Sequence, residues 1–500
     1  MAVAPSQHVA YIFQDVQKGL AAVTSWILLE NGTVIDGTGA PPQSRASVLV
    51  AGNRIVEVGD SATIEKVPRG ESLKVIDATG KTVMPGLIDG HCHLSYGDSR
   101  TQEEQDLYTS VEARTLRAAF NAKKMLRAGV TSISQPGGSY YIGVAVRDAI
   151  KVGMVEGPRM TAAGRYLSTS NSLTDYYPDS VGVPDGSVGV LTNTVHEMIS
   201  EVRHQVKNGV DLIKLADSPY GQYQAFTNDE LKAISDMTHQ LKKKVTIHAR
   251  GPAEVGAAVD AGVDWIMHGN MMTDSVVEKL AKSKIPLVPT LLLLANFAEW
   301  GDRVGAPVGQ RDGCKRMLDK TADSLHRAHA AGVKFVLGTD SGFSVTPYGE
   351  WHAREIELLM EYAGLTAMEG IQAATSNAAS LVNLEGEVGE ILPGRLADLL
   401  VINGDPLTNI RVLLDKTCIE MVIKDGREVI FDDNIDRIRW PHDRAQVFSV
   451  SDLTYDLIYG SGEPPAEEER LPWSQTDGRE LAVQLKTIES QARIAGFGEE

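Results

Sequence analysis

The chain has 500 residues, of which 43% are hydrophobic and 23% are charged, an ordinary composition for a folded protein of more than one domain. A net charge of −18 argues against nucleic acid or an anionic membrane as a partner. The three cysteines, Cys92, Cys314 and Cys418, are too scattered for a disulfide framework, and the apolar stretches are too short to span a bilayer. We therefore expect a cytoplasmic protein.

The first part of the chain predicts a short leading segment and then strands. Residues 1–25 lack the basic start of a secretory signal. Residues 26–83 contain "SWILLENGTVIDGTGAPP" and "ASVLVAGNRIVEVGD", in which β-branched runs flank Asn-Gly or Gly-Asn turns. This texture indicates a small β domain.

After residue 83, strand-like runs alternate with helical patterns, which is typical of β/α units around a parallel sheet. Thr227 and Glu230 form a capping-box pattern at the start of one such helix. Eight β/α units over residues 84–385 predict an α/β fold of the TIM-barrel type, (β/α)8. The eight runs are "GLIDGHCHL", "GVTSISQP", "RMTAAGRYLS", "GVDLIKLAD", "KKVTIHAR", "GVDWIMHGN", "IPLVPTL" and "GVKFVLGTD".

Beyond the predicted barrel, the chain returns to β texture over residues 386–432. We expect this segment to combine with residues 26–83 in one small composite β-sandwich that flanks the barrel. Residues 433–500 form an acidic, turn-rich tail with an amphipathic helical pattern in "RELAVQLKTIESQARI". Two interpretations of the tail stay open: an arm that packs on a partner subunit of a homo-oligomer, or a partly disordered segment.

Residues that can bind a metal lie where the predicted strands end, which is where barrels of this type carry their active sites. His91 and His93 point to the same side because side chains alternate along a strand. Each residue alone has an ordinary explanation, such as a packed histidine, a snorkelling lysine or a helix N-cap aspartate. Together on one rim they predict a metal site made of His91, His93, Lys214, His248, His268 and Asp340.

The sequence resembles the amidohydrolase superfamily. The matching segments are "VMPGLIDGHCHL", "LIKLAD", "VTIHARG", "WIMHG", "GTDSG", "AGLTAMEGIQAATSNAA" and "GEVGEILPGRLADLLVINGDPL", in that order. The resemblance covers about residues 27–430. It is strongest to the branch of imidazolonepropionases, Xaa-Pro dipeptidase-like enzymes, ochratoxin amidases, and phenylurea and molinate hydrolases.

The resemblance implies a binuclear metal centre that cleaves a C–N bond. His91, His93 and Asp340 would bind one divalent ion, and His248 and His268 the other. Lys214 would bridge the ions as an N-carboxylated lysine, because an ammonium group has donors only and cannot ligate a cation. Zinc suits such a site, and cobalt or manganese are tolerated.

The implied mechanism uses a hydroxide that the metals generate from water near neutral pH. Asp340 would be the catalytic acid and base, and Lys214 would hold the metals together. Cys92, between the two histidines, is expected to point away into packing.

The residues that select a small-molecule substrate are less defined. Relatives of the peptidase type often carry Arg-Asp and a histidine where this chain has Ser134, Gln135 and Leu173. We therefore expect a neutral, partly apolar substrate such as an aryl amide, carbamate or urea. The alternatives are an Xaa-Pro-type dipeptidase or N-acyl amino acid amidase and, remotely, a non-catalytic barrel scaffold. The candidate pocket residues, each of which could equally be structural, are Leu173, Tyr220, Tyr223, Trp351 and His352.

Overall fold

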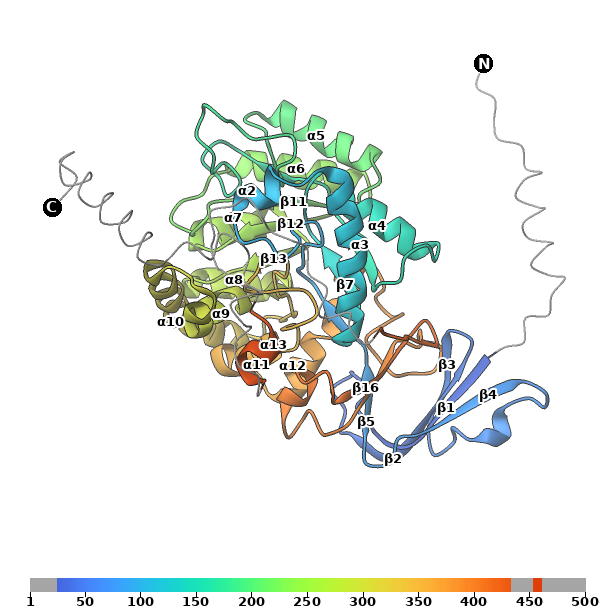
Figure 1. Ribbon diagram of the computed structural model, residues 1–500. Coiled ribbons are helices and arrows are strands. Elements are labelled where there is room, and N and C mark those ends of the chain that lie inside the picture. Colours follow the sequence, from blue (N-terminus) through green and yellow to red (C-terminus); the bar gives the residue numbers. More distant parts are fainter. Residues whose placement is uncertain (1–24, 433–452, 461–500) are drawn as a thin grey trace, which may run out of the picture.

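A computed structural model of the chain describes residues 25–432 and 453–460. Figure 1 shows a β region that protrudes from a larger region in which helices surround strands. None of the described helices is long and apolar enough to cross a membrane. The predicted helix at "RELAVQLKTIESQARI" and residues 1–24 lie outside the described residues.

Both flanks of the predicted barrel join in one mixed sheet of eight strands, in the order β17-β16-β15-β5-β1-β2-β3, with β4 paired to β1. Strand β5 pairs with β15 in antiparallel register, Met84 opposite Leu400, and so connects segments more than 300 residues apart. The strands are β1 (Ser25–Val34), β2 (Gln43–Ala51), β3 (Arg54–Gly59), β4 (Ser72–Asp77), β5 (Thr82–Pro85), β15 (Leu399–Ile402), β16 (Ile419–Lys424) and β17 (Arg427–Glu428).

The central strands of the other region are parallel and buried. They form a three-stranded sheet, β6-β7-β8, and a six-stranded sheet, β10-β9-β11-β12-β13-β14. Burial on both faces explains their continuous apolar runs. The strands are β6 (Leu87–Asp89), β7 (Val130–Gln135), β8 (Arg159–Ala162), β9 (Tyr166–Ser168), β10 (Gly189–Leu191), β11 (Leu212–Ala216), β12 (Lys244–Ala249), β13 (Trp265–His268) and β14 (Leu287–Val288).

Helices alternate with these strands, and their ends follow local chemistry. The predicted capping box is present: Thr227 and Glu230 exchange hydrogen bonds at the start of α6, and Gly262 ends α7 in the left-handed conformation. Short 3-10 helices occupy Ile64–Lys66, Gly301–Val304, Ser376–Val382 and Ile410–Leu413. The α-helices are α2 (Gln102–Asp106), α3 (Val111–Arg127), α4 (Ile142–Lys151), α5 (Val195–Lys207), α6 (Asn228–Gln240), α7 (Pro252–Ala261), α8 (Asp274–Ser283), α9 (Leu292–Trp300), α10 (Val308–Ala330), α11 (Arg354–Ala363), α12 (Ala367–Ala373) and α13 (Tyr455–Tyr459).

Two of the eight predicted strands differ from the structure. The third run divides into β8 and β9, and the eighth run forms only an isolated parallel bridge between Phe335 and Leu287. The amide of Leu337 donates to the carbonyl of Ala373, the last residue of α12, at 2.9 Å. This amide is therefore not available to pair with a neighbouring strand. The carbonyl of Leu337 still accepts from Gly90 at 2.9 Å, which places this segment beside the end of β6.

The described part of the C-terminal tail packs on its own chain. Leu453 is buried, and its carbonyl accepts a hydrogen bond of 2.6 Å from the Trp351 indole. The rings of Tyr455 and Tyr459 in α13 lie 6.1 and 6.3 Å from the Trp351 ring. Trp351 therefore anchors residues 453–460, and this contact accounts for its burial without a role in a pocket.

Candidate metal centre

Three buried side chains converge at the end of β6. The Nε2 atoms of His91 and His93 lie 3.1 Å apart, and Asp340 Oδ1 lies 3.4 Å from the first and 3.0 Å from the second. One potential ligand atom from each residue falls within 4.8 Å of the others. This is the spacing of a group that could hold one metal ion.

Backbone hydrogen bonds bring Asp340 to the two histidines although 247 residues separate it from His93. The amides of Thr339 and Asp340 donate to the carbonyl of His91 at 3.1 and 2.7 Å, and the amide of His93 donates to Ser341 at 2.8 Å. Asp340 has a φ of 56°, a left-handed conformation that is uncommon outside glycine. Strained backbone of this kind is concentrated at functional sites.

The hydrogen bonds of the other ring nitrogens fix the tautomers of His91 and His93. His93 Nδ1 donates to the carbonyl of Gly137 at 2.8 Å, because a carbonyl can only accept. The Thr290 hydroxyl donates to Val288, so it accepts from His91 Nδ1 at 3.0 Å. Both Nε2 atoms therefore present lone pairs to each other and to a carboxylate. This arrangement is repulsive unless a cation lies between them.

His248 and His268 continue the histidine group from the ends of β12 and β13. Their ring centroids lie 4.4 Å apart, and the His268 ring lies 5.4 Å from the His91 ring. His248 Nε2 and His268 Nδ1 are buried and have no hydrogen-bond partner among the described residues. Buried polar atoms without partners are rare, so these two nitrogens fit a second bound metal.

Burial keeps the histidines in the form that ligates metals. Loss of solvation lowers the pKa of His91, His248 and His268 well below the usual histidine value. The rings are therefore neutral at physiological pH, and each has one nitrogen lone pair available for a metal.

Lys214 is a poor structural lysine. Its amine is buried, and among residues 25–432 and 453–460 its hydrogen-bond partner is the Met267 sulfur at 2.5 Å, a weak acceptor. The amine also lies 5.6 Å from the centre of the Tyr166 ring. Burial lowers the pKa of Lys214 to about 7. A neutral amine is the form that reacts with carbon dioxide, so these surroundings suit carboxylation.

Cys92 lies between His91 and His93 in sequence but points elsewhere. Its thiol is buried in the hydrophobic core and faces the carbonyl of Ser134 at 3.7 Å. Burial raises the pKa of the Cys92 thiol well above its usual value. A thiol in these surroundings stays protonated. Its direction is the one expected from the alternation of side chains along a strand.

The pocket candidates occupy different surroundings. Tyr220 is 63% exposed, and the Tyr223 hydroxyl donates to the carbonyl of Asn171 at 2.6 Å. Leu173 packs on a small cluster that contains Tyr166 and Tyr96. Only Leu173 therefore contacts a side chain that borders the histidines.

His352 does not face an open pocket. Its ring is buried: Nδ1 donates to Asp89 at 2.8 Å, and Nε2 accepts from the amide of Gly349 at 3.1 Å. Because both ring nitrogens are engaged, His352 has no group left for a substrate. It supports the centre through Asp89, which also accepts from the amides of His91 and Thr339 at 3.0 and 3.2 Å.

Sequence reasoning missed two tyrosines at the centre. The Tyr166 hydroxyl lies 3.1 Å from His93 Nε2 and 2.5 Å from the Tyr96 hydroxyl, and the Tyr96 ring stacks on His93 with centroids 4.3 Å apart. Tyr166 begins β9, within the third predicted strand run, so the rule that found the ligands at strand ends could have selected it. Tyr96 follows in a loop, where sequence periodicity gives no signal.

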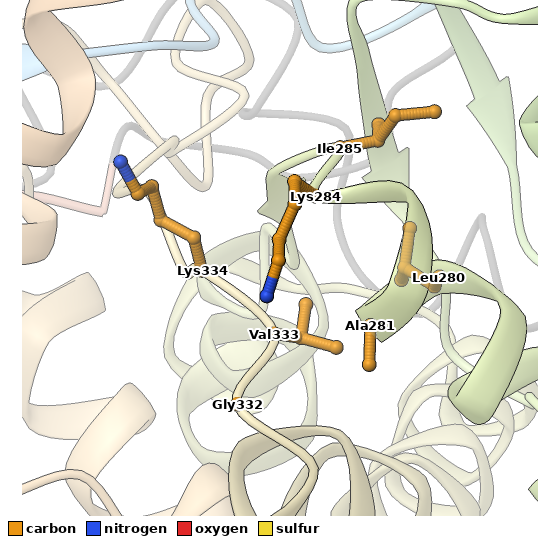
Figure 2. A pocket seen from close by; sticks show the side chains of 7 residues that line it. All are labelled: Leu280, Ala281, Lys284, Ile285, Gly332, Val333 and Lys334. Atoms are coloured by element: carbon orange, nitrogen blue, oxygen red, sulfur yellow. The ribbon is translucent and has the colours of Figure 1, made fainter.

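A separate cavity of about 300 Å³ lies at the opposite ends of the strands. Figure 2 shows it between the end of α8 and the turn before Phe335, with the amines of Lys284 and Lys334 at its edge. Its lining is otherwise aliphatic and includes none of the residues of the histidine group. It is therefore not part of the candidate metal centre.

Comparisons with known proteins agree on one family. The sequence model of the Amidohydrolase family matches residues 82–429. Ochratoxinase of Aspergillus niger is 27% identical over 427 residues, 79% of this chain and 85% of the relative. Imidazolonepropionase of Streptomyces griseus subsp. griseus is 26% identical over 77% of this chain and 92% of the relative.

Solved structures give the same result. A crystal structure of a prolidase in complex with N-methylphosphonate-L-proline has a TM-score of 0.71 and 28% identity, and the match covers 81% of this chain and 99% of that one. Neighbours of this family imply a TIM-barrel fold with mixed α/β content. The resemblance stated from the sequence motifs is confirmed.

Proposed function

Because the chain belongs to the amidohydrolase family, we propose that it hydrolyses an amide-type C–N bond at a centre of two divalent metal ions. Family membership makes the chain a hydrolase acting on carbon–nitrogen bonds. The substrate is an aryl amide, a carbamate or a urea, or an N-acyl amino acid. The observation that carries the proposal is the pair of Nε2 lone pairs, on His91 and His93, that face each other 3.1 Å apart beside a carboxylate.

Each of the six side chains has a role in this centre. His91, His93 and Asp340 would hold one ion, and the nitrogens of His248 and His268 that lack a partner among the described residues would hold the other. Lys214, once carboxylated, would offer anionic oxygens to the centre in place of a buried cation. We favour zinc, which suits histidine nitrogens with oxygen ligands, with cobalt or manganese as substitutes.

Bound metals would supply Lewis acidity, which activates water and polarises the scissile carbonyl. Asp340 moves the proton: its Oδ atoms take a proton from the attacking water and deliver it to the leaving nitrogen. The Tyr166 hydroxyl, 3.1 Å from His93 Nε2, is placed to donate a hydrogen bond to the carbonyl oxygen as charge develops there. Burial of these groups excludes bulk water and strengthens each of these interactions.

A second candidate is an Xaa-Pro-type dipeptidase, because the prolidase in complex with a proline phosphonate matches 81% of this chain. The positions at which the sequence lacks charged groups argue against it. Ser134 and Gln135 are buried, and Ser134 accepts a hydrogen bond of 3.2 Å from Thr161. Neither side chain offers a cation to a peptide carboxylate.

The test is a substrate screen with metal-loaded protein. Neutral anilides, ureas, carbamates and N-acyl amino acids are incubated with the wild type, and the released amine is quantified. His248→Ala should abolish turnover, since it removes a metal ligand. His239→Ala is the matched control, because His239 is a surface histidine paired with Asp264 at 3.0 Å, and it should keep wild-type rates. Equal loss in both variants would contradict the proposed site.

The remaining parts of the proposal concern the barrel, the β-sandwich, the cellular location and the assembly. The hydrogen bonds that run from β14 through residues 335–337 to Gly90 support a closed barrel over residues 84–385. The eight-stranded sheet supports a composite β-sandwich of residues 26–83 and 386–432. A cytoplasmic location and assembly into a homo-oligomer complete the proposal.

A further inference from the structure

Arg250 is a buried arginine that has no ion-pair partner within residues 25–432 and 453–460, and it lies next to the candidate metal centre. It follows His248 by two residues, and 8% of its surface is exposed. Its Nη1 donates to Asn270 Oδ1 at 2.6 Å and faces the Met317 sulfur at 3.8 Å. Nε is buried with no hydrogen-bond partner, and Nη2 makes no hydrogen bond within the described residues.

The unpaired edge of this guanidinium is the one that recognises carboxylates. Nε and Nη2 form the fork that binds both oxygens of a carboxylate at once. A buried arginine without such a partner loses solvation that nothing replaces, so its neighbours in a native protein normally include an acceptor. Among the residues described by the structure, the side chain of Arg250 has two acceptors, the Asn270 amide oxygen and the weakly accepting Met317 sulfur, and neither is charged.

The nearby carboxylates are engaged elsewhere. Glu254 Oε2 accepts from the amides of Arg250 and Gly251 at 2.6 and 2.7 Å, and Oε1 accepts from Ser218. Asp340 Oδ1 faces His91 and His93. Neither forms an ion pair with the guanidinium, so the fork edge has no acceptor among the described residues.

Arg250 lies two residues after His248 and packs against the loop after β11, because a Cβ added at Gly221 would lie 2.9 Å from Arg250 Cβ. Tyr220, the neighbour of Gly221 in this loop, is 63% exposed. The backbone of Arg250 therefore lies between the candidate metal centre and a partly exposed loop.

The fixed position of Arg250 indicates a recognition role. Arg250 and Asn270 each lie two residues after a histidine of the centre, just beyond the ends of the neighbouring strands β12 and β13. The amide of Met271 donates to the carbonyl of Arg250 at 3.0 Å and joins the two strand ends. A cation held this firmly loses little conformational entropy when it binds a ligand.

We infer that Arg250, oriented by Asn270, binds a carboxylate of the substrate, so that the enzyme acts on an amide that carries an anionic group near its scissile bond. This inference rests on the proposed function and deepens it by naming the substrate class. It also replaces the expectation of a neutral substrate, which considered the ends of the second and third predicted strands. The cation is supplied instead from the end of β12.

The test compares matched substrate pairs that differ only in charge. The first pair is N-benzoylglycine and its N-methylamide, with the charge on the amine side. The second is succinanilic acid and its N-methylamide, with the charge on the acyl side. In at least one pair, the wild type should favour the free acid in kcat/KM by about ten- to a hundredfold, the range expected for a bidentate arginine contact.

Variants assign this preference to a residue. Arg250→Gln should bring the ratio of free acid to twin to about threefold or less, and Arg250→Lys, which keeps the charge but not the fork, should give an intermediate ratio. Arg354→Gln is the matched control: Arg354 is buried and donates to Asn296 at 2.5 Å, but Glu299 also pairs with it. Arg354→Gln should keep the wild-type ratio at whatever rate it retains.

Two outcomes would overturn the inference. An unchanged ratio in Arg250→Gln would place the carboxylate site elsewhere. An equal loss on both twins, with loss of bound metal, would mean that Arg250 serves the metal centre, for example as the partner of a carboxylated Lys214.

A binding measurement separates this inference from the proposed function. If the wild type turns over neither pair, the proposed function fails for these substrates. Calorimetry with the free acids and the metal-loaded protein then decides the role of Arg250. If the free acids bind at least tenfold more weakly to Arg250→Gln than to the wild type, the inference is supported. Equal affinity of the two proteins contradicts it.

Discussion

Asp89→Ala removes a buried carboxylate that connects the backbone at His91 with the segment that carries Asp340. Asp89 is fully buried at the end of β6 and accepts from the amides of His91 and Thr339 at 3.0 and 3.2 Å. Its second oxygen accepts from the Thr339 hydroxyl at 2.5 Å and from His352 Nδ1 at 2.8 Å. The substitution therefore removes an acceptor from four buried donors near His91 and Asp340, of which the Thr339 amide keeps the His91 carbonyl at 3.1 Å.

The expected loss of stability follows from these four contacts. A buried donor left unsatisfied costs about 1–3 kcal/mol, and partial relaxation or an entering water offsets part of the sum. Removing one partner from a buried charged network typically costs about 3–5 kcal/mol. We expect Asp89→Ala to lower the free energy of unfolding by about 4 kcal/mol. The substitution also removes the hydrogen bond that holds the His91 backbone in place. Metal affinity should therefore fall by about ten- to a hundredfold.

Urea unfolding of the metal-free protein measures the first effect, and titration with a divalent metal measures the second. Asp77→Ala is the control, because Asp77 accepts from the amide and hydroxyl of Thr79 at 2.9 and 2.6 Å in an exposed turn. Its expected loss is below about 1 kcal/mol. Equal losses of unfolding free energy in the two variants would refute the argument that the Asp89 hydrogen bonds are strongly stabilising because they are buried.

Two further substitutions test the chemistry of the centre. Lys214→Ala should reduce kcat to near background, and acetate or propionate should restore part of it by supplying an anionic two-oxygen bridge; near-normal turnover of the variant with metals bound would make the lysine purely structural. Asp340→Asn should lower kcat by several orders of magnitude with the fold intact, because an amide cannot move a proton at neutral pH; a steady-state loss below about tenfold, roughly 1.4 kcal/mol, would place the proton transfer on another group.

The ends of the parallel strands were predictable from the sequence. Apolar runs bounded by turn signals located β11, β12 and β13, and Lys214, His248 and His268 lie within or at the ends of these strands. The alternation of side chains also predicted that Cys92 points away from its neighbouring histidines, as the structure shows. These inferences succeed because strand geometry is set locally and repeats every two residues.

The surroundings of the centre depend on contacts between distant segments, which periodicity does not encode. His352 was a pocket candidate, but it pairs with Asp89, 263 residues earlier in the chain. The eighth predicted strand is irregular because Leu337 donates to Ala373 outside the sheet. Arg250 was visible in the sequence, but only the structure shows that its Nε lacks a partner.

The central claim, a binuclear hydrolytic centre, is tested most directly by metal stoichiometry measured together with activity. Protein purified after growth with zinc should contain about two metal ions per chain by elemental mass spectrometry. Its activity should fall in parallel as a chelator removes them and return when zinc is added back. A fully active enzyme with one ion per chain, or with none, would contradict the account.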